Sequence, residues 1–112
     1  MADCIFCKII NKEIPLDREP IYEDENFLVI FNKFPQAEIH ILLILKKHIN
    51  SVAKSTADDR DLLGGLLVLA AKVAREKEIE DFKLIFNNGK HAEIHHLHLH
   101  LLSGSNLKTV TV

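Results

Sequence analysis

The chain has 112 residues, of which 47% are hydrophobic and 27% charged, and its formal net charge is −2. This length and composition predict one globular domain over residues 1–112, with a core of about 4–104 and a C-terminal tail at 105–112. The charge gives no basic surface for nucleic acid, and the longest apolar run, residues 62–71, is too short to span a membrane. Two cysteines without a secretory signal pattern favour a cytoplasmic location.

The hydrophobic pattern predicts two helices and five strands. In chain order they are a helix over about 4–11 capped by Asp3, strands at 20–24, 27–31 and 39–45, a long helix from a capping box at 56–59 to about 77, a strand at 82–86, and a strand at 96–101. The order of helix, three strands, helix and two strands favours an α+β fold with an antiparallel sheet.

The segment 95–100 contains four of the seven histidines. Histidine and leucine alternate from 96 to 101, so a strand would place His96, His98 and His100 on one face and the leucines on the other. Three interpretations are open for this row: a histidine-rich exposed face, a pair of metal ligands, or an imidazole nucleophile. Imidazole at three positions in one register favours a functional site.

Cys4 and Cys7 form a Cys-x-x-Cys pair near the start of the chain. A structural zinc site needs two further ligands, which His48 and one histidine of the 95–100 segment can supply. Inert thiols and a redox pair are the alternatives, although no predicted strand precedes the motif as it does in thioredoxin-like units.

Two further positions are candidates for the same site. Asn87-Asn88-Gly89 is typical of a hairpin turn, but its N–H groups can also hold a phosphate. His40 interrupts an otherwise apolar strand, as a hydrogen-bonded core residue or as a further member of the histidine site.

Six segments together resemble one known family, in the same order over about residues 4–104. They are Cys4-Ile-Phe-Cys-Lys-Ile-Ile, Ile21-Tyr-Glu-Asp, Pro35-Gln-Ala, His40 with its apolar strand and Lys46-Lys-His-Ile, Asn87-Asn-Gly, and His96-x-His-x-His-x-x. The chain is similar to the histidine triad (HIT) family, and within it to the Hint-type nucleoside phosphoramidases of bacterial pattern. The resemblance implies a five-stranded antiparallel sheet with a short N-terminal helix and one long helix. It also implies a homodimer whose ten-stranded sheet has the long helices at the interface.

The resemblance further implies a hydrolase of purine nucleoside 5′-phosphoramidates or related conjugates of a nucleotide such as AMP. His98 would attack the α-phosphorus to form a nucleotidyl-histidine intermediate, supported by His100 and His40, with no catalytic metal. The implied substrate-binding residues are Asn32, Asn87, Gly89 and Glu93. The implied ligands of a structural Zn²⁺ are Cys4, Cys7, His48 and His96.

The segment after Asn87-Asn-Gly departs from the family pattern. It runs Lys90-His-Ala-Glu-Ile-His, two residues shorter than usual, and lacks the Gly-Gln pair that surrounds the phosphate. A nucleotide-binding or zinc-stabilised interaction protein with weak or no catalysis is therefore the alternative function. A metal-dependent enzyme that uses the histidine row as ligands is a third hypothesis.

Overall fold

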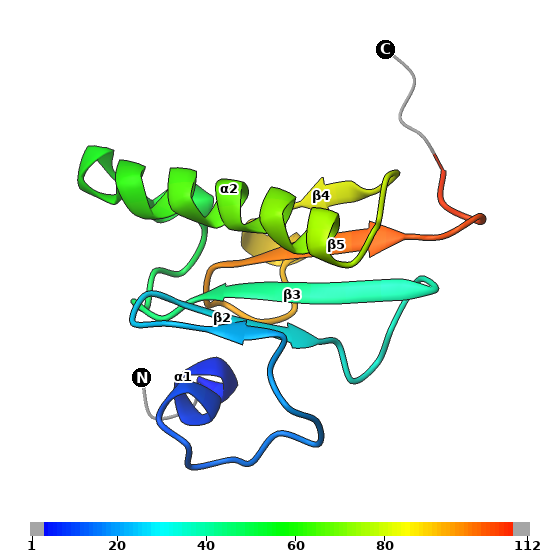
Figure 1. Cartoon of the computed structure of the whole chain (residues 1–112). Helices are drawn as coiled ribbons and strands as arrows, with labels where there is room; N and C mark the ends of the chain where they lie inside the picture. Colours follow the sequence, from blue (N-terminus) through cyan, green and yellow to red (C-terminus); the bar gives the residue numbers. More distant parts are fainter. Residues whose placement is uncertain (1–3, 109–112) are drawn as a thin grey trace.

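A computed structural model describes residues 4–108, and its centre is a five-stranded antiparallel sheet (Figure 1). The strands are β1 (Tyr22–Glu23), β2 (Phe27–Phe31), β3 (Ile39–Leu45), β4 (Lys83–Ile85) and β5 (His98–Ser103), in the spatial order β1-β2-β3-β5-β4. The helices are α1 (Ile5–Ile10) and α2 (Arg60–Glu76), with short 3₁₀ turns η1 (Val52–Lys54), η2 (Ala57–Asp59) and η3 (Gly89–His91). The predicted order of elements and the α+β fold are confirmed. Between residues 4 and 108, no helix has the length and apolar character needed to cross a membrane.

The two helices cover opposite faces of the sheet (Figure 1). On one face, α2 packs the buried side chains of Leu66, Leu69, Ala70, Val73 and Ala74 against alternate residues of β2, β3 and β5. On the other face, α1 packs Phe6 against Leu28, Ile30, Leu42 and Ile44. Because β3 lies between both layers, every residue from His40 to Leu45 is buried.

The register of β3 and β5 decides which face the histidines occupy. Ile44 pairs with His98, Leu42 with His100, and His40 with Leu102. Directly opposite residues in an antiparallel pair point to the same face. Since Leu42 and Ile44 pack on the α1 side, His40, His98 and His100 share that side as well.

The N-terminus of α1 differs from its prediction. The N-cap is Cys4, whose Sγ accepts a hydrogen bond from the Cys7 N–H at 3.4 Å. The predicted cap, Asp3, lies outside the described residues, as do residues 109–112 of the predicted tail. A helix of six residues is unstable by itself, so tertiary contacts must hold α1 against the sheet.

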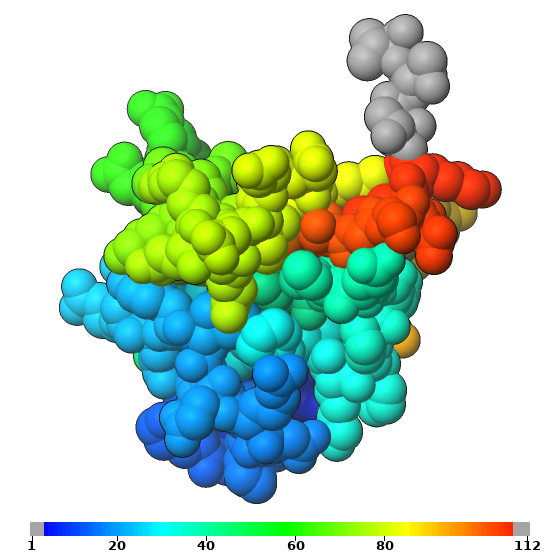
Figure 2. Space-filling view, turned by 45° about the vertical axis from the view of Figure 1, so that its right-hand side comes forward, coloured from blue at the N-terminus to red at the C-terminus, as the bar shows by residue number. Residues whose placement is uncertain are grey.

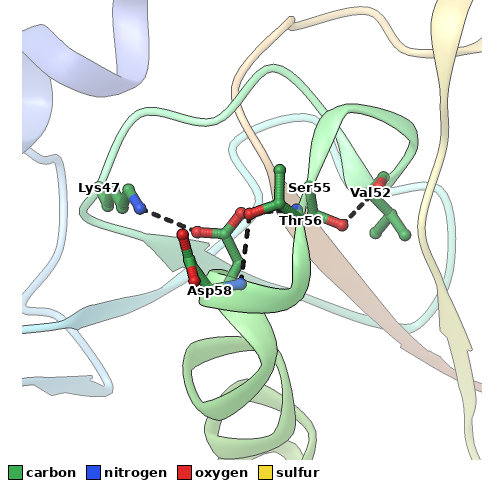
Figure 3. A network of polar contacts seen from close by, with 6 residues as sticks. Lys47, Val52, Ser55, Thr56 and Asp58 are labelled. Carbon is green, nitrogen blue, oxygen red and sulfur yellow. Dashed lines mark hydrogen bonds and ion pairs between the residues drawn. The ribbon is translucent and has the colours of Figure 1, made fainter.

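The capping box predicted before the long helix is present (Figure 3). Thr56 accepts a hydrogen bond from the Asp58 N–H at 3.2 Å, and the Asp59 carboxylate accepts one from the Thr56 N–H at 2.9 Å. The same carboxylate pairs with the Lys47 ammonium at 2.8 Å. This network joins the start of α2 to the segment that carries His48.

Two local predictions before β5 are wrong. The strand begins at His98 instead of residue 96, and residues 93–96 form a series of bends. Asn87-Asn88-Gly89 is not a tight hairpin turn, because a segment from 86 to 97 separates β4 from β5 and Gly89 starts η3 with φ of +62°. Just before β5, the Leu97 N–H donates to the Ile49 carbonyl at 2.7 Å, so the chain at residue 97 bonds to the segment after β3 and does not continue the ladder.

Candidate functional site

A cavity of about 1110 Å³ opens on the α1 side of the sheet. Its floor contains His40, His98 and His100, and its walls come from α1, residues 14–19, residues 31–36 and residues 87–94. In the space-filling view, the blue N-terminal segments lie beside the cyan segment after β2, at the end of the molecule away from α2 (Figure 2). This volume is sufficient for a ligand the size of a nucleotide.

His98 has one ring nitrogen committed to the backbone. Its Nδ1–H donates to the His96 carbonyl at 2.7 Å, because a carbonyl oxygen only accepts. The lone pair is therefore on Nε2. Burial lowers the pKa of His98, and the hydrogen bond to His96 opposes that shift only in part. The ring is neutral near pH 7, which is the form that can act as a nucleophile.

His40 and His100 have the opposite arrangement of protons. The Gln36 N–H donates to His40 Nδ1 at 3.0 Å, so the proton of the neutral His40 ring is on Nε2. His40 Nε2–H donates in turn to His100 Nδ1 at 2.8 Å, which leaves the His100 proton on Nε2. The floor of the cavity thus combines a lone pair on His98 with an N–H donor on His100.

The pKa values of this pair keep both rings neutral. Burial lowers the pKa of His40, and His98 adds to the effect. Burial, followed by the neighbouring His98 and His40, lowers the pKa of His100 to about 4. A neutral His100 can donate a hydrogen bond to a phosphoryl oxygen without carrying a full charge.

The predicted substrate-binding residues lie at the cavity, with one exception. Asn32, Asn87 and Glu93 line it, whereas Gly89 is not among the lining residues. The Oδ1 atom of Asn32 is engaged within its own loop, since it accepts from the Phe34 N–H at 2.8 Å. Its Nδ2 lies 3.2 Å from His40 Nε2, but both atoms are donors in this tautomer, so Nδ2 keeps its hydrogens for another acceptor. The contacts of these side chains with a substrate stay predictions.

Two residues at this site were missed by the sequence analysis. Phe6 contacts the His98 ring edge-to-face, with the centroids 5.0 Å apart, and the backbone of Gln36 fixes the proton of His40. A signal existed for Phe6, because it lies between two candidate ligands on a short helix. A backbone donor such as that of Gln36 leaves no signal in the sequence.

A second group of side chains lies beside the cavity, at the start of α1. The ligand atoms of Cys4, Cys7, His48 and His96 all lie within 4.8 Å of one another. Cys4 Sγ is 3.3 Å from His96 Nδ1, and Cys7 Sγ is 3.2 Å from His48 Nδ1. A tetrahedral zinc ion, with bonds of about 2.3 Å to sulfur and about 2.1 Å to nitrogen, separates such atoms by about 3.5 Å. The four residues therefore fit a metal ion.

His96 is oriented for this role by its second nitrogen. Its Nε2–H donates to the Leu45 carbonyl at 2.6 Å, which leaves the lone pair on Nδ1, the atom that faces the cysteines. A hydrogen bond from the second ring nitrogen is the usual support of a histidine ligand. Burial, with the hydrogen bond to Cys4, raises the pKa of Cys7, so this thiol holds its proton near neutral pH. Because the thiolate is the form that ligates a metal, binding of a cation would release that proton.

The fold, the triad of histidines and the cysteine pair together define a class of protein. A family described as "Scavenger mRNA decapping enzyme C-term binding" matches residues 3–110. The chain is 44% identical to an uncharacterised HIT-like protein of Synechocystis over 91% of this chain and 90% of that protein. It is 37% identical to protein HitA of Neisseria gonorrhoeae over 91% of this chain and 96% of that protein.

Solved structures agree with this assignment. A histidine triad protein from Clostridium difficile superposes with a TM-score of 0.90 at 36% identity, covering 99% of this chain and 98% of that chain. A HIT family hydrolase from Legionella pneumophila superposes with a TM-score of 0.85 at 37% identity, covering 95% and 96%. The chain belongs to the histidine triad family.

The lowered pKa of His100 predicts how its ring titrates. In the unfolded chain the ring has an ordinary pKa of about 6.5, whereas in the fold the pKa is about 4. As the pH falls below 6.5, the unfolded state binds the proton first, so the contribution of His100 to stability is present above that pH and is lost toward pH 4. The His100 ring resonances should stay constant in NMR spectra from pH 8 to 5.5.

A midpoint near 6.5 for His100 would contradict the buried neutral ring. The His100→Gln variant identifies the resonances, and it should also weaken the dependence of the free energy of unfolding on pH between 6.5 and 4.

Proposed function

We propose that the protein is a hydrolase of purine nucleoside 5′-phosphoramidates or related nucleotide conjugates. The observation that carries the proposal is the pair of opposite tautomers, the lone pair on His98 Nε2 beside the N–H of His100, on the floor of a cavity of about 1110 Å³. Phosphoryl transfer to an imidazole needs a neutral nucleophile together with a donor for the phosphoryl oxygens. The cluster of cysteines supports a cytoplasmic protein, in which thiols remain reduced.

In the first step, His98 Nε2 forms a bond to the α-phosphorus and the P–N bond to the amine breaks. The electron pair of that bond goes to the leaving nitrogen, which takes up a proton from solvent. His100 Nε2–H donates to a phosphoryl oxygen, and the backbone of Gln36 keeps that proton in place through His40. In the second step, water attacks phosphorus, loses a proton to solvent and releases His98 with its lone pair restored.

The walls of the cavity suit the remainder of a nucleotide. Ile9, Ile14 and Leu16 give one wall of the cavity an apolar surface for a base. Lys90 and His91, in the wall formed by residues 87–94, bring polar groups that could bind phosphate. The Nδ2 donor of Asn32 and the amide of Asn87 are the groups that could bind ribose or phosphate oxygens. AMP or a conjugate of AMP is the proposed ligand.

Removal of the nucleophile tests the proposed reaction. His98→Ala should lower the turnover of an adenosine 5′-phosphoramidate by at least about a thousandfold, as loss of a covalent nucleophile does in other enzymes. His95→Ala is the matched control, because His95 is exposed and does not line the cavity. It should keep the turnover of the native protein. Equal turnover by native protein and His98→Ala would refute the mechanism.

A nucleotide-binding or interaction protein without strong catalysis is the second candidate. The observation that favours it is the segment after Asn87, where Gly89 is not among the residues that line the cavity and the family's Gly-Gln pair is missing. Tight binding of AMP without turnover would select this function. A metal-dependent enzyme would lose turnover on chelation, but His98 and His100 are not among the clustered metal-binding residues.

We propose zinc as the metal of the cysteine–histidine cluster, in a structural role. Two thiolates and two imidazoles in a closed set of four suit Zn²⁺, and such a set leaves no open position for substrate. Elemental analysis of the purified protein should find about one zinc per chain. Cys7→Ala should lower that content strongly, and a native content far below one would argue against the four-ligand site.

We propose that a second copy of the chain covers the edge strand β4 and the outer face of α2. Val68 and Leu67 on α2 are 69% and 44% exposed, and Leu84 on β4 is 37% exposed. Pairing β4 with its copy would extend the sheet to ten strands. Val68→Glu should convert a dimer to a monomer in size-exclusion chromatography with light scattering.

Phe34→Glu is the matched control for the dimer, because Phe34 is 76% exposed but lies at the cavity. It should leave the molar mass unchanged. A monomeric native protein at micromolar concentration would contradict the dimer.

A further inference from the structure

The helix α1 contributes to both the metal cluster and the cavity. Cys4 and Cys7 flank a single turn that also contains Phe6, and Ile5 and Ile9 of the same helix line the cavity. The described contacts that hold this six-residue helix are the cysteine cluster and the packing of Phe6, Ile9 and Ile10 on the sheet. A metal ion bound by both cysteines would therefore fix one wall of the cavity.

Phe6 is the first connection between the metal cluster and the proposed nucleophile. Its side chain is 3% exposed. The ring lies edge-to-face on His98, with centroids 5.0 Å apart and an interplanar angle of 76°, and on His96, with centroids 5.8 Å apart and an angle of 89°. One aromatic ring thus contacts a metal-ligating imidazole and the reacting imidazole together.

The backbone of His96 is the second connection. Its ring faces the cysteines through Nδ1, while its carbonyl accepts the hydrogen bond from His98 Nδ1–H at 2.7 Å. This carbonyl lies outside β5, in the bent segment 93–96, so its position depends on the Leu97 N–H of the same peptide unit, which donates to the Ile49 carbonyl at 2.7 Å, and on the anchored His96 side chain. The position of the His96 side chain therefore influences the acceptor that keeps the His98 proton on Nδ1.

We propose that the metal centre positions the nucleophile, with Phe6 and the backbone of His96 as positioning residues that connect the cluster to His98. The proposal rests on the proposed function. Without the metal, α1 keeps only its apolar packing on the sheet, so the Phe6 ring and the His96 backbone are held less firmly against the His98 ring. The His98 proton then distributes between Nδ1 and Nε2, and only the Nδ1–H form has its lone pair on the attacking atom. Loss of an outer-shell partner of a metal ligand typically costs about 10- to 100-fold in metal affinity or activity, and Phe6 packs on the proposed ligand His96 from such a position.

Two substitutions separate this role from general stability. Cys4→Ser removes a metal ligand but retains an oxygen that can cap α1, because serine is a preferred N-cap residue. Phe6→Leu keeps an apolar side chain but removes the ring against His98. Phe27→Leu is the matched control, since Phe27 is also a buried phenylalanine but packs on the α2 side of the sheet. The comparison uses native protein with one equivalent of Zn²⁺, the same protein after chelation, and the three variants.

The first readout is the tautomer of His98 at fixed neutral pH, from long-range ¹H–¹⁵N NMR spectra. Zinc-loaded native protein and Phe27→Leu should show only the Nδ1–H form. Chelated protein, Cys4→Ser and Phe6→Leu should show a second form or a mixture. The second readout is kinetic: Phe6→Leu should lower kcat by about 10- to 100-fold, with a smaller change in KM.

An unchanged His98 tautomer after chelation and in Phe6→Leu would overturn the proposal. Collapse of the whole spectrum on chelation would also overturn it, because the metal would then support the entire fold instead of α1. A zinc-dependent tautomer in a protein without turnover would retain this inference and refute the hydrolase. Turnover with a zinc-independent tautomer would do the reverse.

Discussion

The chemistry of the site depends on one hydrogen bond, from His98 Nδ1–H to the His96 carbonyl. If the proton were on Nε2, the lone pair of Nδ1 would face the His96 carbonyl, and His98 could not serve as the proposed nucleophile. The His96 carbonyl can accept this bond because it lies in the bent segment before β5, whereas a carbonyl within a regular ladder would bond to the neighbouring strand. The irregular segment 93–96 thus supplies an acceptor that an extended strand lacks.

Burial reinforces this arrangement through the pKa values of the floor. Desolvation lowers the pKa of His40, His98 and His100, since removal from water penalises the charged imidazolium. All three rings are then neutral, and their hydrogen-bond partners alone decide which nitrogen carries each proton. The Gln36 N–H is a donor and places the proton of His40 on Nε2, whereas the His96 carbonyl is an acceptor and places the proton of His98 on Nδ1. This difference gives His100 a free N–H and His98 a free lone pair.

The sequence predicted the order of elements and the shared face of His98 and His100, because both follow from local periodicity, whereas the place of His40 beside them depends on the pairing of β3 with β5, which the sequence left open. Alternation of leucine and histidine requires Leu99 and Leu101 to be buried, and both have no exposed surface. The same rule failed at His96, which lies before the strand: its ring donates to the Leu45 carbonyl and the next residue, Leu97, donates its N–H to the Ile49 carbonyl, and both acceptors are about fifty residues earlier in the chain. The contacts of Phe6 and the backbone donor at Gln36 are likewise tertiary. The choice of His96 as the fourth proposed metal ligand came from the family resemblance, since the residue pattern alone allowed any histidine of the segment 95–100.

The two layers of the molecule differ in how they secure the site. The sheet fixes His40, His98 and His100 through strand pairing with β3, whose six residues from His40 to Leu45 are buried between both layers. The wall at α1 has only six helical residues, and local opening in proteins begins at such segments with few buried contacts. Cys4, the N-cap, and Cys7, one turn later, both belong to the N-terminal turn of α1, so a metal ion held by them would stabilise the element that would open first. The four clustered side chains come from three separate segments, and a metal ion bound by them would secure the part of the cavity wall that strand pairing does not reach.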